Sequence, residues 1–180
     1  MSKPFKELRD ALKTVDMKTV NKAAEMIITS LKKGGKLITF GNGGSATDAD
    51  HLASELMVRY KKERRPLPAI SLTNPAILTA AGNDYGYGQV FARPLNALLQ
   101  PNDVIVAIST SGRSGNVNTA VMNHTGPTIY LTGAYKGEDM TGMDALFIHI
   151  PSTTTSVIQD CHRAIIHHWC EKIDREFCDA

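Results

Sequence analysis

The chain has 180 residues, of which 42% are hydrophobic, 21% charged and 6% aromatic. These proportions are typical of an ordinary globular domain and exclude disordered, collagen-like and coiled-coil classes. Its 20 Lys and Arg residues against 18 Asp and Glu residues leave a formal charge of +2, too little to predict nucleic acid or an anionic membrane surface as a partner.

The first residues lack the apolar core of a signal peptide, and no later stretch approaches the roughly 18 apolar residues of a membrane span. We therefore expect a cytoplasmic protein. A chain of this length buries enough surface to fold without disulfides or a structural metal. Since no linker or internal repeat divides it, residues 1–180 are expected to form a single domain.

Apolar residues recur at helical intervals over 8–15 and again over 20–31, which predicts two helices or one bent helix at the start of the chain. Residues 36–40 then read as a short strand that enters a glycine-rich loop at 41–45. A helix is expected after this loop. Its core-facing residues are predicted to be Leu52, Ala53, Leu56 and Met57.

Four further runs are apolar, rich in Ile, Val and Leu, and do not alternate, which is typical of strands covered on both faces. They occupy residues 67–72, 104–109, 128–132 and 145–150. Helical segments are expected at 77–81, 90–99 and 115–123, and a long closing helix at 157–177. The predicted fold is therefore α/β, a doubly wound five-stranded parallel sheet flanked by helices, with an N-terminal helical extension.

The three cysteines, Cys161, Cys170 and Cys178, fall in the last twenty residues without a C-x-x-C pair. An odd number in this arrangement favours reduced thiols over a disulfide frame or a cysteine-rich zinc site. We therefore expect them to be packing residues of the closing helix.

Two loops follow predicted strands at the edge of the sheet where ligands of parallel α/β proteins bind. The loop 41–45 (GNGGS) supplies small residues that let backbone N–H groups approach a polar ligand, and it leads into a helix whose N-terminus favours anions. The loop 109–114 (STSGRS) places four hydroxyls and a guanidinium before another helix, which predicts a phosphate site. Neither loop has the spacing of a P-loop or a dinucleotide fingerprint, so nucleotide binding is not favoured.

His51 and Glu55 are four residues apart and would project from one face of the helix just beyond the first loop. Such a pair can be a metal-ligand pair, an acid/base element or an exposed contact, and spacing alone does not choose between them. The closing helix adds four polar candidates for a proton donor or metal ligand: Gln159, His162, His167 and His168.

Six motifs occur in the order that is seen in phosphoheptose isomerases, members of the sugar isomerase (SIS) domain superfamily. They are FGNGGS at 40–45, H-x-x-x-E at 51–55, AGNDYG at 81–86, ISTSGRS at 108–114, LTG at 131–133 and IQD-x-H at 158–162. Together they span nearly the whole chain, and six ordered motifs are far more specific than any one loop. The chain thus resembles this family.

The resemblance implies a homotetramer with active sites between subunits, a catalytic Zn²⁺, and conversion of sedoheptulose 7-phosphate to D-glycero-D-manno-heptose 7-phosphate. By matching motif, it implies that the phosphate is held by Ser109, Thr110, Ser111 and Ser114. It implies that the sugar is contacted by Asn42, Gly43, Gly44, Glu55, Asn83, Asp84 and Gln159. The implied zinc ligands are His51, Glu55, Gln159 and His167, of which Glu55 and His167 are also the implied acid/base pair.

The chemistry of aldose–ketose isomerisation asks for such a set of groups. A proton leaves a carbon beside a carbonyl and returns to the neighbouring carbon through an enediol, which requires a base and a second proton-transferring group. Glu55 and His167 fit these roles. A cation near the two oxygens would stabilise the enediolate charge, and His, Glu and Gln suit zinc.

The spacing of two implied ligands is unusual. Gln159 and His167 are eight residues apart, which on a straight helix is about 12 Å of rise and roughly 80° of rotation. From spacing alone, His162 is the easier partner for Gln159. The same interval of eight in the family's matching motif favours His167, so His162 is expected to pack behind the site and His168 to lie at the surface or an interface.

The segment 59–65 holds five basic residues. Because the net charge is small and no array of aromatic residues accompanies the segment, we expect solvated surface at the end of the His51 helix and no nucleic-acid contact.

Two other functions stay open. One is an isomerase of a different phosphosugar, and the other is a non-catalytic SIS-type module that binds a sugar phosphate or a protein. The presence of Glu55 and His167 favours an enzyme.

Overall fold

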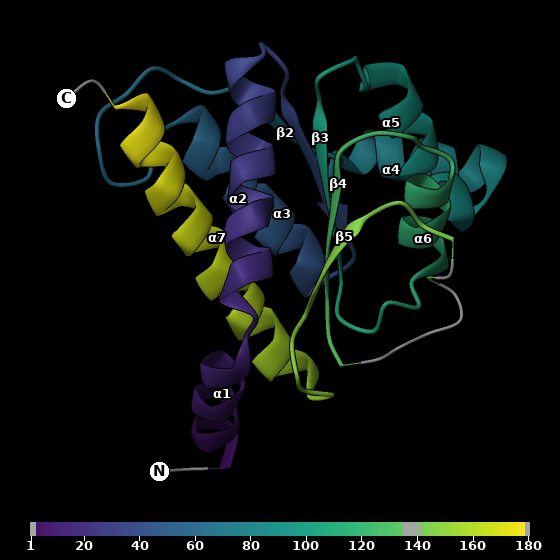
Figure 1. Cartoon of the computed structure of the whole chain (residues 1–180). Coiled ribbons are helices and arrows are strands. Elements are labelled where there is room, and N and C mark those ends of the chain that lie inside the picture. Colours follow the sequence, from purple (N-terminus) through teal and green to yellow (C-terminus); the bar gives the residue numbers. More distant parts are fainter. Residues whose placement is uncertain (1–2, 135–139, 141, 179–180) are drawn as a thin grey trace.

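Five parallel strands form a sheet with helices on both faces (Figure 1). The computed structural model describes residues 3–134, 140 and 142–178. The strands lie in the order β2-β1-β3-β4-β5, so the predicted fold class is confirmed. Their bounds are Leu37–Gly41 (β1), Ala69–Ser71 (β2), Val104–Ser109 (β3), Thr128–Thr132 (β4) and Leu146–His149 (β5).

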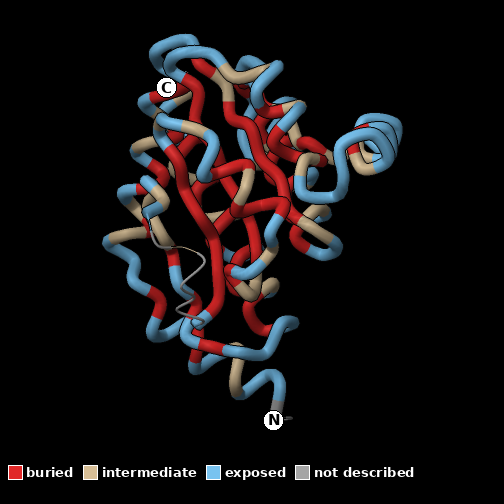
Figure 2. Tube along the Cα trace, turned by 90° about the vertical axis from the view of Figure 1, so that its right-hand side faces the viewer, coloured by how far each residue is buried: buried red, intermediate tan, exposed pale blue. Residues whose placement is uncertain are grey.

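The helices divide into two groups, one on each face of the sheet (Figure 1). One group comprises α1 (Lys3–Thr14), α2 (Met17–Lys32), α3 (Gly44–Met57) and α7 (Thr155–Phe177). The other comprises α4 (Pro75–Tyr85), the 3₁₀ turn η1 (Tyr87–Gln89), α5 (Ala92–Leu98) and α6 (Gly115–Met122). Each face has its own cluster of buried apolar side chains, and Figure 2 shows the strands as the buried centre between them.

The sheet has a switch point between β1 and β3. β1 pairs in parallel with β2 on one side and β3 on the other, and Gly41 lies opposite Ile108 at the carboxyl ends. The chain moves outward in opposite directions from this pair of strands, which is the topology at which ligands bind in this class of fold. The two loops selected from the sequence therefore flank the usual ligand position of this fold class.

The N-terminal region forms two separate helices, one of the two predicted alternatives. Asp16 accepts hydrogen bonds from the backbone N–H groups of Lys18 and Thr19 and so caps α2. α1 projects beyond the sheet and packs against α7 (Figure 1). No helix among the described residues is long and apolar enough to cross a bilayer.

Two details differ from the sequence predictions. Met57, expected to face the core, is 52% exposed, because α3 ends there and turns its last residue outward. β2 covers only residues 69–71 of the predicted 67–72, since Pro66 and Pro68 cannot donate backbone hydrogen bonds and confine this edge strand.

Candidate active site

The loop after β1 is fixed by one asparagine. Asn42 and Asn116 exchange reciprocal amide hydrogen bonds of 2.9 Å, and the Tyr87 hydroxyl donates to Asn42 Oδ1 at 3.1 Å. Gly43 follows at φ +55°, a conformation that favours glycine, and serves as the N-cap of α3. Asn42 thereby joins the β1 loop to α6 and to η1, at the N-terminus of α3.

The loop after β3 brings its hydroxyls together at the start of α6. Ser109 Oγ and Ser114 Oγ are 2.9 Å apart, and Ser114 is the N-cap of the helix. Ser111 Oγ accepts the backbone N–H of Arg113 at 3.1 Å. Two hydroxyls, exposed backbone and a helix N-terminus in one turn make an arrangement suited to a phosphate group.

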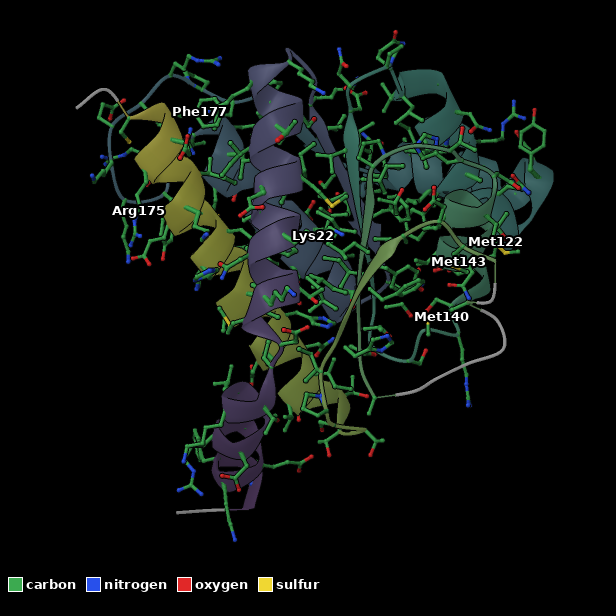
Figure 3. The ribbon with its side chains drawn as sticks, viewed as in Figure 1. Lys22, Met122, Met140, Met143, Arg175 and Phe177 are labelled. Carbon is green, nitrogen blue, oxygen red and sulfur yellow. The ribbon has the colours of Figure 1, made fainter. Side chains whose placement is uncertain are left out.

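Buried polar side chains hold the loop 109–114 in place by hydrogen bonds. Asn118 Nδ2 donates to the carbonyl of Gly112, and Asn118 Oδ1 accepts the Tyr130 hydroxyl at 2.6 Å. Burial raises the pKa of Tyr130 to about 12, so the phenol stays neutral and keeps donating. A Cβ on Gly112 would lie 2.9 Å from the thioether of Met140, which Figure 3 shows below α6. The loop is therefore held on both sides.

Two imidazoles and a carboxylate meet between α3 and α7. His51 Nε2 lies 2.9 Å from His167 Nε2 and 3.6 Å from Glu55 Oε1. The two imidazole rings meet edge to face, with centroids 5.1 Å apart. The side chains of His51 and Glu55 are 30% and 19% exposed, so the cluster is accessible from solvent. The structure thus brings together His51, Glu55 and His167, three of the four residues that the resemblance implies as zinc ligands.

The surroundings of His167 lower its pKa, which favours the neutral imidazole. Burial lowers its pKa, the neighbouring His51 lowers it further, and the Glu55 carboxylate opposes both effects only in part. A neutral imidazole can accept a proton and then return it, as an acid/base group requires.

α3 and α7 lie side by side and run in the same direction, so successive positions of one meet successive positions of the other. Gln159 lies against Gly44, where a Cβ would be 2.2 Å from its amide nitrogen. One turn further along α7, Arg163 pairs with Asp48 at 2.7 Å. His167 then meets His51, which is about 10 Å of helical rise beyond Gly44. Gln159 and His167 therefore contact α3 at two separate places.

The cluster offers two imidazole nitrogens and a carboxylate oxygen, which are ligands that zinc prefers, whereas Gln159, the fourth implied ligand, lies against Gly44 away from the cluster. Within residues 3–134, 140 and 142–178, however, no three His, Cys, Asp or Glu side chains form a group placed to hold a metal ion. His51 and His167 instead stand at the distance of a direct hydrogen bond.

One candidate residue of the closing helix and two implied sugar contacts lie away from the cluster. His162 is fully buried, with its Nε2 3.4 Å from the Thr132 carbonyl, and burial lowers its pKa to about 4. It packs behind the site, as expected. Asn83 and Asp84 are exposed at the end of α4, on the opposite face of the sheet from α7, and Asn83 Nδ2 donates to Asp84 Oδ1 at 2.8 Å.

The basic segment corrects one prediction. Arg59, Lys61, Lys62 and Arg65 are exposed, as expected for solvated surface. Arg64 is not, because its side chain is 1% exposed and pairs with Asp174 of α7 at 3.0 Å. His168 Nε2 donates to Asn21 Oδ1 of α2 at 2.9 Å, so it lies at an interface between helices of the same chain.

Several residues of the site carry no motif of their own. Tyr60 stacks on the His167 ring, and Asn116 and Tyr87 bind Asn42. A polar Asn in the first turn after the hydroxyl loop is a signal that could have identified Asn116. No local pattern indicates Tyr60, because its contact depends on packing between distant segments.

Comparisons with known proteins agree with this architecture. A family model described as SIS domain matches residues 3–126. A phosphoheptose isomerase of Aquifex aeolicus is 47% identical over 160 residues, which cover 87% of this chain and 83% of the relative. One from Shewanella loihica is 44% identical over 163 residues with the same coverage. The structure of a phosphoheptose isomerase from Neisseria gonorrhoeae superposes with a TM-score of 0.84 at 36% identity, covering 96% of this chain and 93% of that one.

The parallel sheet, the hydroxyl loop at its switch point and the family match define a SIS-domain protein. Relatives above 40% identity cover most of the chain. The chain therefore belongs to the phosphoheptose isomerase family.

Proposed function

We propose that the chain isomerises sedoheptulose 7-phosphate to D-glycero-D-manno-heptose 7-phosphate through an enediol. Family membership supports the substrate. The observation that carries the chemistry is the cluster of Glu55, His51 and His167 on two adjacent helices, in a chain that also has a phosphate-suited loop after β3.

Glu55 and His167 are the proposed acid/base pair. In the direction from ketose to aldose, one of them takes a proton from C1, and a proton is delivered to C2. The hydroxyl proton on O1 is lost and O2 is protonated, so atoms and charges balance. Their shared contact with His51 supports this assignment, because it places the carboxylate and the imidazole together between α3 and α7.

Substrate binding is assigned to the two loops. Ser109, Thr110, Ser111 and Ser114 are proposed to hold the phosphate at the N-terminus of α6. The sugar hydroxyls are proposed to contact residues of the β1 loop and of three helices: Asn42, Gly43, Gly44, Glu55, Asn83, Asp84 and Gln159. The phosphate anchors the substrate at a distance from the reacting carbons, which lets binding energy orient them.

Zinc fits the chemistry of the donor set, and the residues proposed to hold it are His51, Glu55, Gln159 and His167. When bound, it would supply a Lewis acid that polarises the carbonyl and stabilises the enediolate charge. We expect turnover to fall after treatment with a chelator and to return on addition of Zn²⁺, with metal content followed by elemental analysis. Full activity in protein shown to be free of metal would contradict the zinc proposal.

The active site is proposed to be shared between subunits of a tetramer in the cytoplasm, where phosphorylated sugars are retained. The exposed position of Asn83 and Asp84, on the other face of the sheet from the cluster, supports a role in a neighbouring subunit's site. The apolar face of α1, where Phe5 is 66% and Leu12 41% exposed, is suited to an interface. Light scattering coupled to size-exclusion chromatography tests the tetramer.

The proposed reaction makes a direct prediction. Incubated with sedoheptulose 7-phosphate in deuterated water, the protein should produce aldoheptose 7-phosphate labelled at C2, which NMR detects. Glu55→Gln should lower turnover by about a hundredfold or more, the size of a lost acid/base group, without changing the circular dichroism spectrum. Unchanged turnover in Glu55→Gln would remove Glu55 from the acid/base role.

Two alternative functions are tested in the same assay. A larger kcat/KM on shorter ketose phosphates would identify an isomerase of a different phosphosugar. Binding of the sugar phosphate without any exchange of deuterium would identify a non-catalytic module.

A further inference from the structure

The segment between α3 and β2 carries a buried arginine. Arg64 Nε donates to Asp174 Oδ1 at 3.0 Å, and their side chains are 1% and 4% exposed. The other guanidinium nitrogens donate to the carbonyls of Leu56 at 2.9 Å and Glu55 at 2.7 Å, the last turn of α3. Because a buried charge is costly unless it is paired and hydrogen-bonded, this set of contacts fixes the position of Arg64.

The second oxygen of Asp174 fixes the backbone next to Tyr60. Asp174 Oδ2 accepts the N–H groups of Lys61 at 3.0 Å and Lys62 at 3.1 Å. One carboxylate on α7 thus holds the arginine and two consecutive backbone groups. At the same end of the molecule, Arg65 lies 5.5 Å from the ring of Phe177, which Figure 3 shows at the end of α7.

The segment held by Asp174 places the ring of Tyr60 against the imidazole of His167. The Tyr60 ring stacks on the imidazole with centroids 5.7 Å apart and an angle of 22° between the planes. The His51 ring contacts the same imidazole edge to face, at 70°. Stacking restrains the plane of the His167 ring but leaves its Nε2 directed at His51. An acid/base group needs such restraint, because small misplacements slow proton transfer strongly.

We propose that Tyr60 is a positioning residue for His167, held against the imidazole by the buried Arg64–Asp174 pair. It acts through His167 and does not itself transfer a proton. The inference rests on the acid/base role proposed for His167 above. A purely structural role for Tyr60, filling space against the core, predicts an effect on stability and none on the chemical step.

The test compares Tyr60→Leu, which keeps apolar volume but removes the flat ring, with Tyr60→Phe, which keeps the ring. We expect Tyr60→Leu to lower kcat about tenfold or more, with KM and the inhibition constant of inorganic phosphate within twofold of the wild type. Tyr60→Phe should keep kcat within twofold. Thermal denaturation identifies any loss of fold, and Tyr60→Met replaces the leucine variant if that variant does not fold.

An unchanged kcat in the folded leucine variant, or equal losses in the leucine and phenylalanine variants, would overturn the positioning role. A wild type that does not turn over sedoheptulose 7-phosphate would instead contradict the proposed function. The two failures are therefore distinguishable in one set of assays.

Discussion

Gly44, the first residue of α3, lies against Gln159 of α7. A methyl group there would overlap the amide of Gln159, whose flexible side chain can move away. Alanine also suits a helix better than glycine. We therefore expect Gly44→Ala to keep or raise the melting temperature while lowering kcat/KM about tenfold, because Gln159 is displaced from the site. Thermal denaturation and steady-state kinetics measure the two effects.

Gly115 supplies the matched control. It is the first residue of α6, as Gly44 is of α3, and among the described residues nothing outside its chain neighbours and its own helix backbone lies within 4 Å of a Cβ built on it. Gly115→Ala keeps the backbone N–H and should leave kcat/KM near that of the wild type. Equal losses in both variants would show that the methyl group perturbs helix N-termini in general, and not Gln159.

Residues of the site were predictable where the contact is local. His51 and Glu55 contact each other because four residues make about one helical turn. Tyr60 and Arg64 were not predictable in this way, since their partners lie more than 100 residues away on α7 and are chosen by packing. For the same reason, the basic residues of segment 59–65 could not be sorted into four exposed side chains and one buried one.

At the scale of elements, α7 makes an ion pair on each side of the cluster. Asp48 of α3 pairs with Arg163 nearer the start of both helices, and Asp174 pairs with Arg64, which follows α3 and donates to its last carbonyls. Asp48 Oδ2 is buried with no hydrogen-bond partner among the described residues, whereas both oxygens of Asp174 are used. The carboxylate of Asp174 is thus more fully hydrogen-bonded than that of Asp48.

Asp174 makes stability depend on pH. Burial raises its pKa, but hydrogen bonds from Lys61, Lys62 and Arg64 outweigh burial and hold the pKa below the ordinary value of 3.8. A depressed carboxyl pKa contributes stability above pH 3.8 that is lost as the pH falls through the folded-state value. We expect Asp174→Asn to cost roughly 3–5 kcal/mol at pH 7, because it leaves Arg64 buried without its charge partner.

Denaturant titrations at several pH values measure this effect. The difference in unfolding free energy between the wild type and Asp174→Asn should shrink on acidification from pH 6 to pH 3. Glu176→Gln, which removes the partner of Lys32 in an exposed pair, is the control and should change little at any pH. A difference that stays constant down to pH 3 would contradict the role of the Asp174 charge.

The elements themselves were largely predictable, because burial on both faces of a parallel sheet leaves continuous apolar runs. β3 and β4 have the predicted bounds. η1 was not predicted, since a single 3₁₀ turn has no hydrophobic period. The start of α4 was also missed, although Asn74 as N-cap and Pro75 at the first helical position are a recognised signal for it.

At the scale of the whole molecule, the closing helix α7 connects every part of the left-hand layer in Figure 1. It contacts α1, α2 and α3, and it carries His167 of the predicted acid/base pair and Gln159 of the predicted ligands. The order of the motifs along the chain predicted the family. It did not predict how the helices pack against one another, because that depends on contacts between distant segments of the chain. A probe of the packing of α7 therefore reports on the integrity of the whole fold.

The three thiols provide that probe. Burial raises the pKa of Cys161 to about 11 and of Cys170 to about 12, while Cys178 at the end of α7 is partly exposed. Because the thiolate is the reactive form, a thiol–disulfide reagent should modify one cysteine quickly in the native protein and the other two only as fast as the helix opens. Cys178→Ser should remove the fast phase, and denaturant should expose all three thiols of the wild type. Two or three fast thiols in the native protein would show that α7 is not packed against the sheet as described.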